Sequence, residues 1–135
     1  MKYLIAAAAL VIIFAGCGSA SYRDGEYSAL SGKDERGAYA EVTLTIRGGK
    51  VTDCVFLTWQ KDGSVKDEDY GKVNGEISNR DFYAKAQLAV RAMEQYRKEY
   101  MDSGSLDGVN AVSGATNSYN QFLEAVEKAL EDAKM

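Results

Sequence analysis

The segment YAEVTLTI, residues 39–46, alternates apolar and more polar side chains with a period of two. Such alternation is typical of a β-strand that buries one face and leaves the other in solvent. Gly48 and Gly49 follow, and then a second run rich in β-branched and aromatic residues from Val51 to Leu57. Because paired glycines suit a tight hairpin turn, the two runs are expected to form antiparallel neighbours.

The regions on either side of this hairpin extend the pattern. A short segment from Glu26 to Leu30 is expected to add another strand. Residues 60–79 are polar and rich in charge and glycine, so they are expected to form a surface loop. The acidic tract 66–69 lacks the spacing and the glycine of a calcium-binding loop, which favours a solvated loop over a metal site.

The next segment has the pattern of a long amphipathic helix. Ser78 is expected to cap it, with Asp81 three residues on, and Ile77 to pack against Phe82. The helix is expected to end near Met101, before an Asp-Ser-Gly sequence. The apolar positions that recur every three or four residues are Phe82, Ala86, Ala89, Val90, Met93, Tyr96 and Tyr100. This stripe is expected to belong to the core and not to a cofactor site.

A second helix is expected at the C-terminus. Ser118 to Gln121 has the form of a capping box, which would place the start of the helix at Ser118. Its expected buried residues are Tyr119, Phe122, Leu123, Val126 and Leu130. The chain therefore predicts an α+β domain over residues 26–135, in which a small antiparallel sheet of N-terminal strands packs with two C-terminal helices.

Composition excludes several classes of function. The formal net charge is −4, and no basic stripe is present, so nucleic acid is not an expected partner. The chain has no histidine, which excludes hydrolase triads, histidine-bound zinc and histidine-ligated haem. It also has no Cys-x-x-Cys motif. Redox chemistry would therefore need an organic cofactor. Cys54 is expected to be a small buried residue.

The N-terminus resembles a lipoprotein signal peptide. Lys2 precedes an apolar run from Leu4 to Phe14, which is well short of the roughly 20 residues of a membrane-spanning helix. Small residues then lead to Cys17, the expected lipidation site. Residues 1–16 would be the signal, and residues 17–25 the lipidated cysteine and a flexible tether. An ordinary secretory signal and an uncleaved anchor are the alternatives. The lipoprotein signal predicts that the protein is exported and anchored to the membrane, at the cell surface or on the periplasmic face.

The segment NAVSGATNS, residues 110–118, gathers small and hydroxyl-bearing residues directly before the second helix. Without bulky side chains its backbone N–H groups can approach an anion, and the helix adds the positive end of its dipole. Phosphate is the expected ligand. The hydroxyls of Ser113 and Thr116 could form hydrogen bonds to it or be esterified by it. A tight turn that simply needs glycine and serine is the alternative.

The order Ser113, Gly114, Ala115, Thr116, followed one residue later by Ser118, resembles the attachment motif of the FMN-binding domain family. This family includes flavin subunits of sodium-pumping NADH:quinone reductases and Rnf-type complexes, and many small extracytoplasmic lipoproteins. The resemblance covers most of the mature chain: residues 24–27, the strand pair at residues 48–50, the long helix and the motif come in the family's order.

The resemblance implies the cofactor and its attachment. Thr116 would be joined to FMN through a phosphoester by a dedicated flavin transferase, and Ser113, Gly114, Ala115, Asn117 and Ser118 would lie around the cofactor. The family usually has an acidic residue three places before the serine of the motif, where this chain has Asn110.

The expected function is that of a membrane-anchored extracytoplasmic flavoprotein. It would transfer electrons between a donor and an acceptor, either proteins or a quinone, without turnover of its own. Trp59 and the nine tyrosines are candidates for the flavin slot. Two alternatives stay open: an FMN-free lipoprotein that serves as a binding module or surface antigen, and a protein that binds flavin reversibly.

Overall fold

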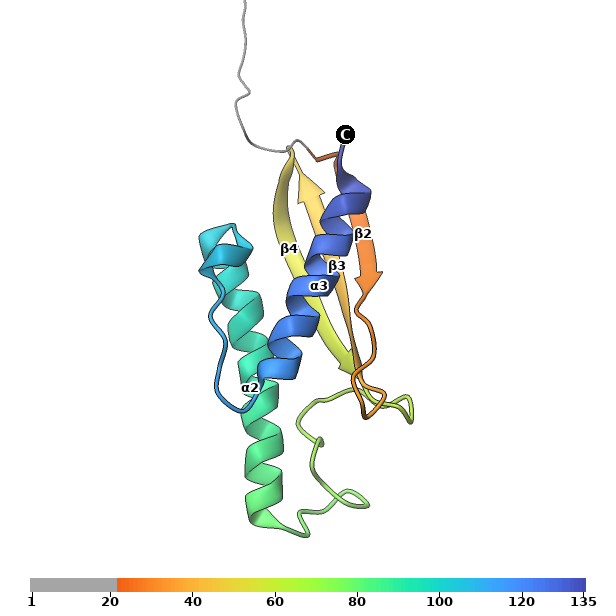
Figure 1. Ribbon diagram of the computed structural model, residues 1–135, viewed down its shortest axis with the longest axis vertical. Helices are drawn as coiled ribbons and strands as arrows, with labels where there is room; N and C mark the ends of the chain where they lie inside the picture. Colours follow the sequence, from red (N-terminus) through yellow and green to blue (C-terminus); the bar gives the residue numbers. More distant parts are fainter. Residues whose placement is uncertain (1–21) are drawn as a thin grey trace, which may run out of the picture.

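The computed structural model describes residues 22–135, which form an antiparallel sheet covered on one face by two helices (Figure 1). The 3-stranded sheet has the order β2-β3-β4. Its strands are β2 (Gly25–Leu30), β3 (Tyr39–Arg47) and β4 (Lys50–Trp59), and the helical elements are α2 (Arg80–Ser103), the 3₁₀ helix η1 (Leu106–Gly108) and α3 (Thr116–Ala133). The α+β fold expected from the sequence is confirmed.

The hairpin forms where the alternating pattern predicts it. Gly48 and Gly49 have φ values of 62° and 77°, the left-handed conformation that a two-residue hairpin turn favours. Arg47 pairs with Lys50 across this turn, and a register shift falls between Thr45 and Ile46. The side chains of β3 that face the helices are fully buried: Ala40, Val42, Leu44 and Ile46.

The core lies between the sheet and the helices. Phe122 of α3 is fully buried and packs against Phe56 of β4, with ring centroids 4.7 Å apart. Tyr96 of α2 is also fully buried and stacks on Phe122, with ring centroids 6.5 Å apart. Cys54 is 2% exposed, which confirms that it is a small buried residue. These contacts join α2, α3 and β4 in a single core.

Helix α2 begins and ends slightly later than expected. Its N-cap is Asn79, whose side chain accepts a hydrogen bond from the backbone N–H of Phe82, so the cap predicted at Ser78 is wrong. Asparagine is as good an N-cap as serine, so the adjacent residues Ser78 and Asn79 could each cap the helix. Ile77 is 49% and Phe82 55% exposed, so neither is buried as the expected staple requires. The helix ends at Ser103, and its C-cap Gly104 adopts the left-handed conformation.

Helix α3 begins at Thr116, before the predicted capping box. Its N-cap is Ala115, and no side chain caps it. Ser118 therefore lies inside the first turn and is buried. The side chain of Gln121 donates to the carbonyls of Gly32 and Ala38 and does not cap the helix. The capping box is wrong because a tertiary contact uses the glutamine, and Thr116 becomes the first helical residue.

The chain enters the described domain beside the C-terminus of α3. Tyr22 forms a bridge with Lys134, and the backbone N–H of Arg23 donates to the carbonyl of Ala133 at 2.8 Å. Thr116 lies at the other end of the same helix (Figure 1). None of the helices described here is long and apolar enough to cross a membrane. The expected signal peptide and Cys17 lie outside the described residues.

Candidate functional site

A cavity of about 470 Å³ lies against the N-terminus of α3. One wall is the segment 114–118, and a second wall comes from the first half of α2. The remaining lining comes from two loops, which contribute Asp34 and Arg36, and Lys66 and Tyr70. The motif at Thr116 therefore lies in a hollow built from four separate parts of the chain.

The backbone before Thr116 is shaped by a tight turn. The N–H of Ala115 donates to the carbonyl of Val112 at 3.0 Å, which closes a four-residue turn. Gly114 has a φ of 89°, a conformation that favours glycine at the third position of such a turn. A side chain at this position would also reach Leu88, which lies 3.4 Å from an added Cβ.

Tyr96 holds this turn from inside the core. Its hydroxyl donates to the carbonyl of Ala115 at 3.0 Å and accepts from the N–H of Val112 at 3.0 Å. Burial raises the pKa of Tyr96, so the neutral hydroxyl that both hydrogen bonds need is retained. A single buried side chain thus fixes both ends of the turn that precedes Thr116.

The N-terminus of α3 presents donors to the cavity. Because no side chain caps the helix, the N–H groups of Thr116, Asn117 and Ser118 have no acceptor among residues 22–135. Thr116 and Asn117 are exposed. Unsatisfied N–H groups and the positive end of the helix dipole together favour an anion at this position.

The loop that carries Asp34 and Arg36 is fixed to α3. Gln121 donates to the carbonyls of Gly32 at 3.2 Å and Ala38 at 2.8 Å. The carboxylate of Asp34 accepts from the backbone N–H groups of Arg36 and Ala38, both at 2.9 Å. The negative charge of Asp34 is thus engaged within its own loop, and the backbone that carries Arg36 is held in place.

The loop that carries Lys66 and Tyr70 is fixed to α2. Gln87 donates to the carbonyl of Tyr70 at 2.9 Å, and the hydroxyl of Tyr83 donates to that of Glu68 at 2.8 Å. Gly71 approaches the helix so closely that an added Cβ would lie 2.6 Å from the Cβ of Ala86. These contacts hold the loop with Lys66 and Tyr70 against α2, beside the cavity.

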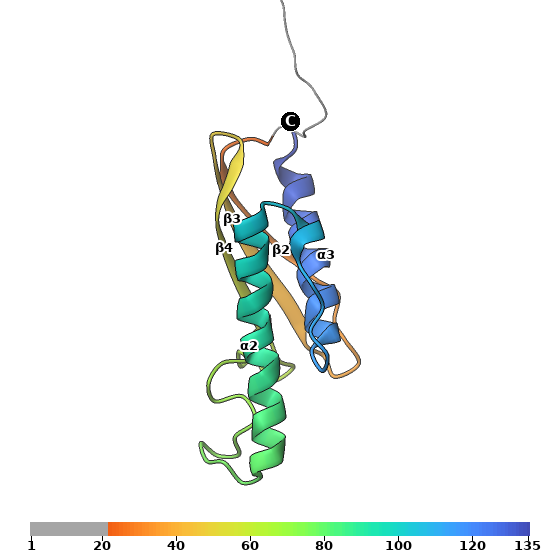
Figure 2. The same ribbon diagram turned by 90° about the vertical axis from the view of Figure 1, so that its left-hand side faces the viewer.

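The apolar stripe of α2 divides between core and cavity. Met93, Tyr96 and Tyr100 are buried in the core, as expected. Ala86 is also buried and Ala89 packs against the core, although both line the cavity as well. Phe82 is 55% exposed and lines the cavity, so the expectation that the whole stripe is core is wrong at this residue. The reason is that α2 extends past the end of the sheet, which leaves its first turns beside the loops (Figure 2).

The predicted cofactor residues are brought together with one exception. Gly114, Ala115, Thr116, Asn117 and Ser118 line the cavity, whereas Ser113 is exposed outside the lining. Trp59, a candidate for the ring slot, does not line the cavity, and its indole N–H donates to Glu41 at 2.9 Å. Of the tyrosines, Tyr70 lines it.

The sequence did not indicate the charged side chains of the lining, and it placed Phe82 in the core. These charged residues are Asp34, Arg36, Lys66 and Lys85. Three of these charged residues are cations, and their positions in the chain share no motif. Only the packing of the two loops against the helices brings them to the same hollow. No signal in the sequence could have selected them from the other charged residues.

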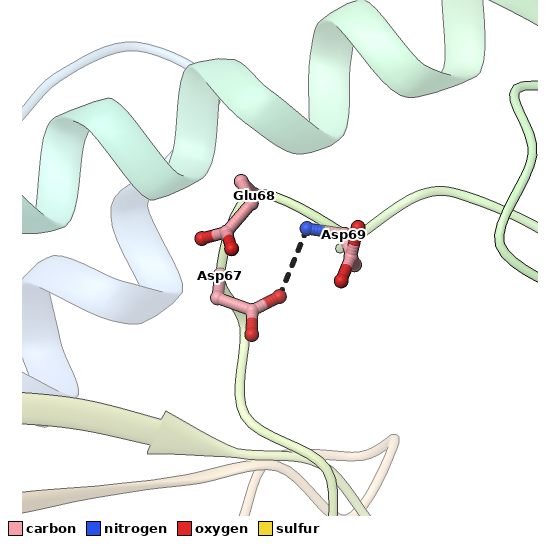
Figure 3. A group of neighbouring side chains, drawn as sticks. All are labelled: Asp67, Glu68 and Asp69. Carbon is pink, nitrogen blue, oxygen red and sulfur yellow. Dashed lines mark hydrogen bonds between the residues drawn. The ribbon is translucent and has the colours of Figure 1, made fainter.

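The carboxylates of the acidic tract, Asp67, Glu68 and Asp69, lie in one loop (Figure 3), between the cavity-lining residues Lys66 and Tyr70. One carboxylate oxygen from each of Asp67, Glu68 and Asp69 lies within 4.8 Å of the others, and all three side chains are exposed. Asp67 accepts from the backbone N–H of Asp69 at 2.9 Å, and Asp69 pairs with Lys72 at 2.9 Å. These contacts agree with the surface loop expected from the sequence.

A larger cavity, of about 600 Å³, lies at the opposite end of the domain. It is lined by Tyr22, Lys50, Tyr100 and Leu106, among others. It contains no uncapped helix N-terminus and none of the motif residues. The smaller cavity is the better candidate because backbone donors, cations and an apolar wall converge on it.

Comparisons with known proteins address the family and the fold. A model of the FMN-binding domain matches residues 37–131. No curated protein gives a match. The fold is similar to that of a Clostridium perfringens protein solved by crystallography, with 24% identity and a TM-score of 0.63 over 83% of this chain and 88% of that chain.

Proposed function

Because this chain belongs to the FMN-binding domain family, we propose that it is an exported electron carrier that holds FMN through a phosphoester at Thr116. The observation that carries the proposal is the exposed Thr116 side chain at the uncapped start of α3, inside a cavity with an apolar wall. Bound FMN would supply reversible uptake of electrons. The residues of the cavity would hold and orient it.

The phosphate end of FMN fits the start of α3. An anion there would accept from the N–H groups of Thr116, Asn117 and Ser118 and would interact favourably with the helix dipole. The turn closed by Val112 and Ala115 contains no bulky side chain, so the phosphate can approach the backbone. The donors have no other partner within the described part of the chain, so binding breaks no hydrogen bond between residues 22–135.

The ring end of FMN fits the remainder of the cavity. Phe82, Ala86 and Ala89 provide an apolar wall, and Tyr70 adds an aromatic side chain to the lining. A volume of about 470 Å³ lies within the usual range for small-molecule sites. Both the charge and the apolar surface of the cavity therefore suit an FMN molecule.

Attachment requires a flavin transferase and an activated FMN donor. The Thr116 oxygen would bond to the donor's phosphorus as the bond from that phosphorus to the leaving group breaks, and the hydroxyl proton would pass to a base of the transferase or to water. The resulting ester keeps one negative charge next to the N–H groups of α3. Such a tether keeps the cofactor bound in a dilute extracytoplasmic space, where reversible binding would depend on the free FMN concentration.

The arrangement of the two ends of α3 suits a carrier anchored at Cys17. The chain enters beside Ala133, and Thr116 lies at the opposite end of this 18-residue helix, about 27 Å away. The four residues between Cys17 and Tyr22 allow a separation of at most about 18 Å. Lipidation of Cys17 would thus hold the domain at the membrane while the flavin end remains accessible to a donor and an acceptor.

The decisive experiment is expression of the precursor in an exporting host, with and without a flavin transferase. Flavin fluorescence that survives denaturation, together with the matching increase in intact mass, is the expected result in the presence of the enzyme. Thr116→Ala should abolish both signals. Ser113→Ala is the matched control, since its hydroxyl is nearby but outside the cavity lining, and it should retain them.

Other outcomes distinguish the alternatives. Loss of the signal in Ser113→Ala alone would place the ester on Ser113. Colour that disappears on denaturation would show reversible binding of flavin. A colourless protein of unmodified mass in both hosts would contradict the carrier function and favour an FMN-free binding module. Mass and labelling of Cys17 by radioactive palmitate would test the lipid anchor independently.

A further inference from the structure

The cavity at Thr116 contains more positive charge than the phosphate alone accounts for. Arg36, Lys66 and Lys85 all line it, and no carboxylate among residues 22–135 forms an ion pair with any of them. The one acidic side chain in the lining, Asp34, is engaged by two backbone N–H groups. A single phosphoester anion would leave the cavity with excess cations.

Two of these cations lie at one end of the cavity. Arg36, Lys66 and Tyr70 also line an adjoining cavity of about 220 Å³, whereas Thr116 lines only the first one. They therefore lie at the boundary between the two spaces. Since the ring and the phosphate are at opposite ends of FMN, a molecule anchored at Thr116 would extend its ring towards this boundary.

Lys66 is held there by its surroundings. Its backbone N–H donates to the carbonyl of Thr58 at 2.9 Å, at the end of β4. Its ammonium nitrogen lies 4.8 Å from the centroid of the Tyr70 ring, and both side chains are half-buried. Arg36 is more exposed, but its backbone is fixed by Asp34. The two positive charges are thus carried by loops that are clamped to α3 and α2.

We infer that Arg36 and Lys66 form a cationic end of the cavity that stabilises the reduced flavin ring and raises its reduction potential. This inference rests on the proposed FMN site. Uptake of two electrons and one proton from the donor converts the neutral oxidised ring into a singly charged anion. Cations beside the ring favour the anion over the neutral ring, because the attraction acts only on the charged form.

The test is a redox titration of the loaded protein. The double variant Arg36→Gln, Lys66→Gln should lower the equilibrium constant for two-electron reduction at least tenfold, which corresponds to a potential lower by about 30 mV. Lys66→Arg, which keeps the charge, should retain most of the wild-type potential. Lys50→Gln, in the cavity at the opposite end, is the control for loss of net charge and should leave the potential unchanged.

The outcomes separate this inference from the proposed function. Intact mass first establishes that each variant carries FMN, and circular dichroism establishes that it is folded. A loaded double variant with the wild-type potential would overturn the inference while leaving the FMN site intact. An equal shift in Lys50→Gln would also overturn it, since the effect would then come from net charge. Absence of flavin from the wild-type protein under all conditions would instead contradict the proposed function.

Discussion

The hydroxyl of Tyr96 donates to the carbonyl of Ala115 at 3.0 Å, across 19 residues of sequence. Ala115 is the N-cap of α3, and its carbonyl also accepts from the N–H of Tyr119 at 3.1 Å. Because Tyr96 is fully buried, this contact connects the core directly to the residue that precedes Thr116. The position of the motif is therefore determined by the packing of α2 against α3.

Removal of this hydroxyl should loosen the motif. We expect Tyr96→Phe to lower the free energy of unfolding by about 1–3 kcal/mol, because the N–H of Val112 and the carbonyl of Ala115 both lose a partner. Urea denaturation measures the loss. Tyr100→Phe is the control, since the structure gives its hydroxyl no hydrogen bond within residues 22–135, and its cost should be smaller. Equal costs would contradict the role of the Tyr96 contact.

Gly71 should be required for the loop that carries Lys66 and Tyr70. Gly71→Ala would place a Cβ 2.6 Å from that of Ala86 at a φ of 99°, so we expect a cost of about 1–3 kcal/mol. Gly63→Ala separates backbone strain from the clash, because Gly63 has a φ of 91° but open space around it. Thermal unfolding should show a larger loss for Gly71→Ala, and hydrogen exchange should increase around Tyr70. A similar loss in both variants would mean that close packing is not the cause.

Cys54 should be unreactive in the folded protein. Burial raises the pKa of its thiol from 9.0 to about 12, and the thiolate is the reactive form. We expect iodoacetamide at pH 8 to label Cys54 only after denaturation, as measured by intact mass. Rapid labelling of the native protein would show that the site opens without global unfolding.

The raised pKa of Cys54 also predicts that the free energy of unfolding falls at alkaline pH. The raised pKa stabilises the fold fully below pH 9.0, and this contribution is lost as pH rises towards about 12, because the unfolded thiol releases its proton first. Tyr100, whose pKa burial also raises from 10.0 to about 12, acts in the same direction. Cys54→Ala should therefore reduce the slope of unfolding free energy against pH in this range without removing it. An unchanged slope would contradict the contribution of Cys54.

The substitution Asn110→Asp tests whether the flavin transferase requires an acidic residue at this position. The backbone N–H of Asn110 donates to the carboxylate of Glu99 at 2.9 Å, so an acidic group from α2 already lies beside this position. By resemblance to the family motif, Asn110→Asp should increase the fraction of flavin-loaded protein when the transferase is limiting, as measured by intact mass. Asn120→Asp, an exposed substitution in α3, is the control for added charge and should not increase it. Equal loading of wild type and Asn110→Asp would show that the enzyme does not need an acid at this position.

Much of the architecture could be predicted from local pattern. The alternation in residues 39–46 and the turn at Gly48 and Gly49 were sufficient for the hairpin, because period and turn geometry are local properties. The predicted helix boundaries agreed less well with the structure. Ser78 and Asn79 are both good caps, and Gln121 is equally suited to a capping box and to the contact with Gly32 that it makes. Local propensity does not choose between such options.

The sequence alone determined the order of strands and helices, the buried thiol and the motif around Thr116, because each depends on neighbouring residues. Only the tertiary structure decided what surrounds that motif. It extended α2 beyond the sheet, so that Phe82 lines a cavity instead of the core, and it brought Arg36 and Lys66 together on two clamped loops. These relations depend on contacts between residues far apart in the chain, which no local period encodes.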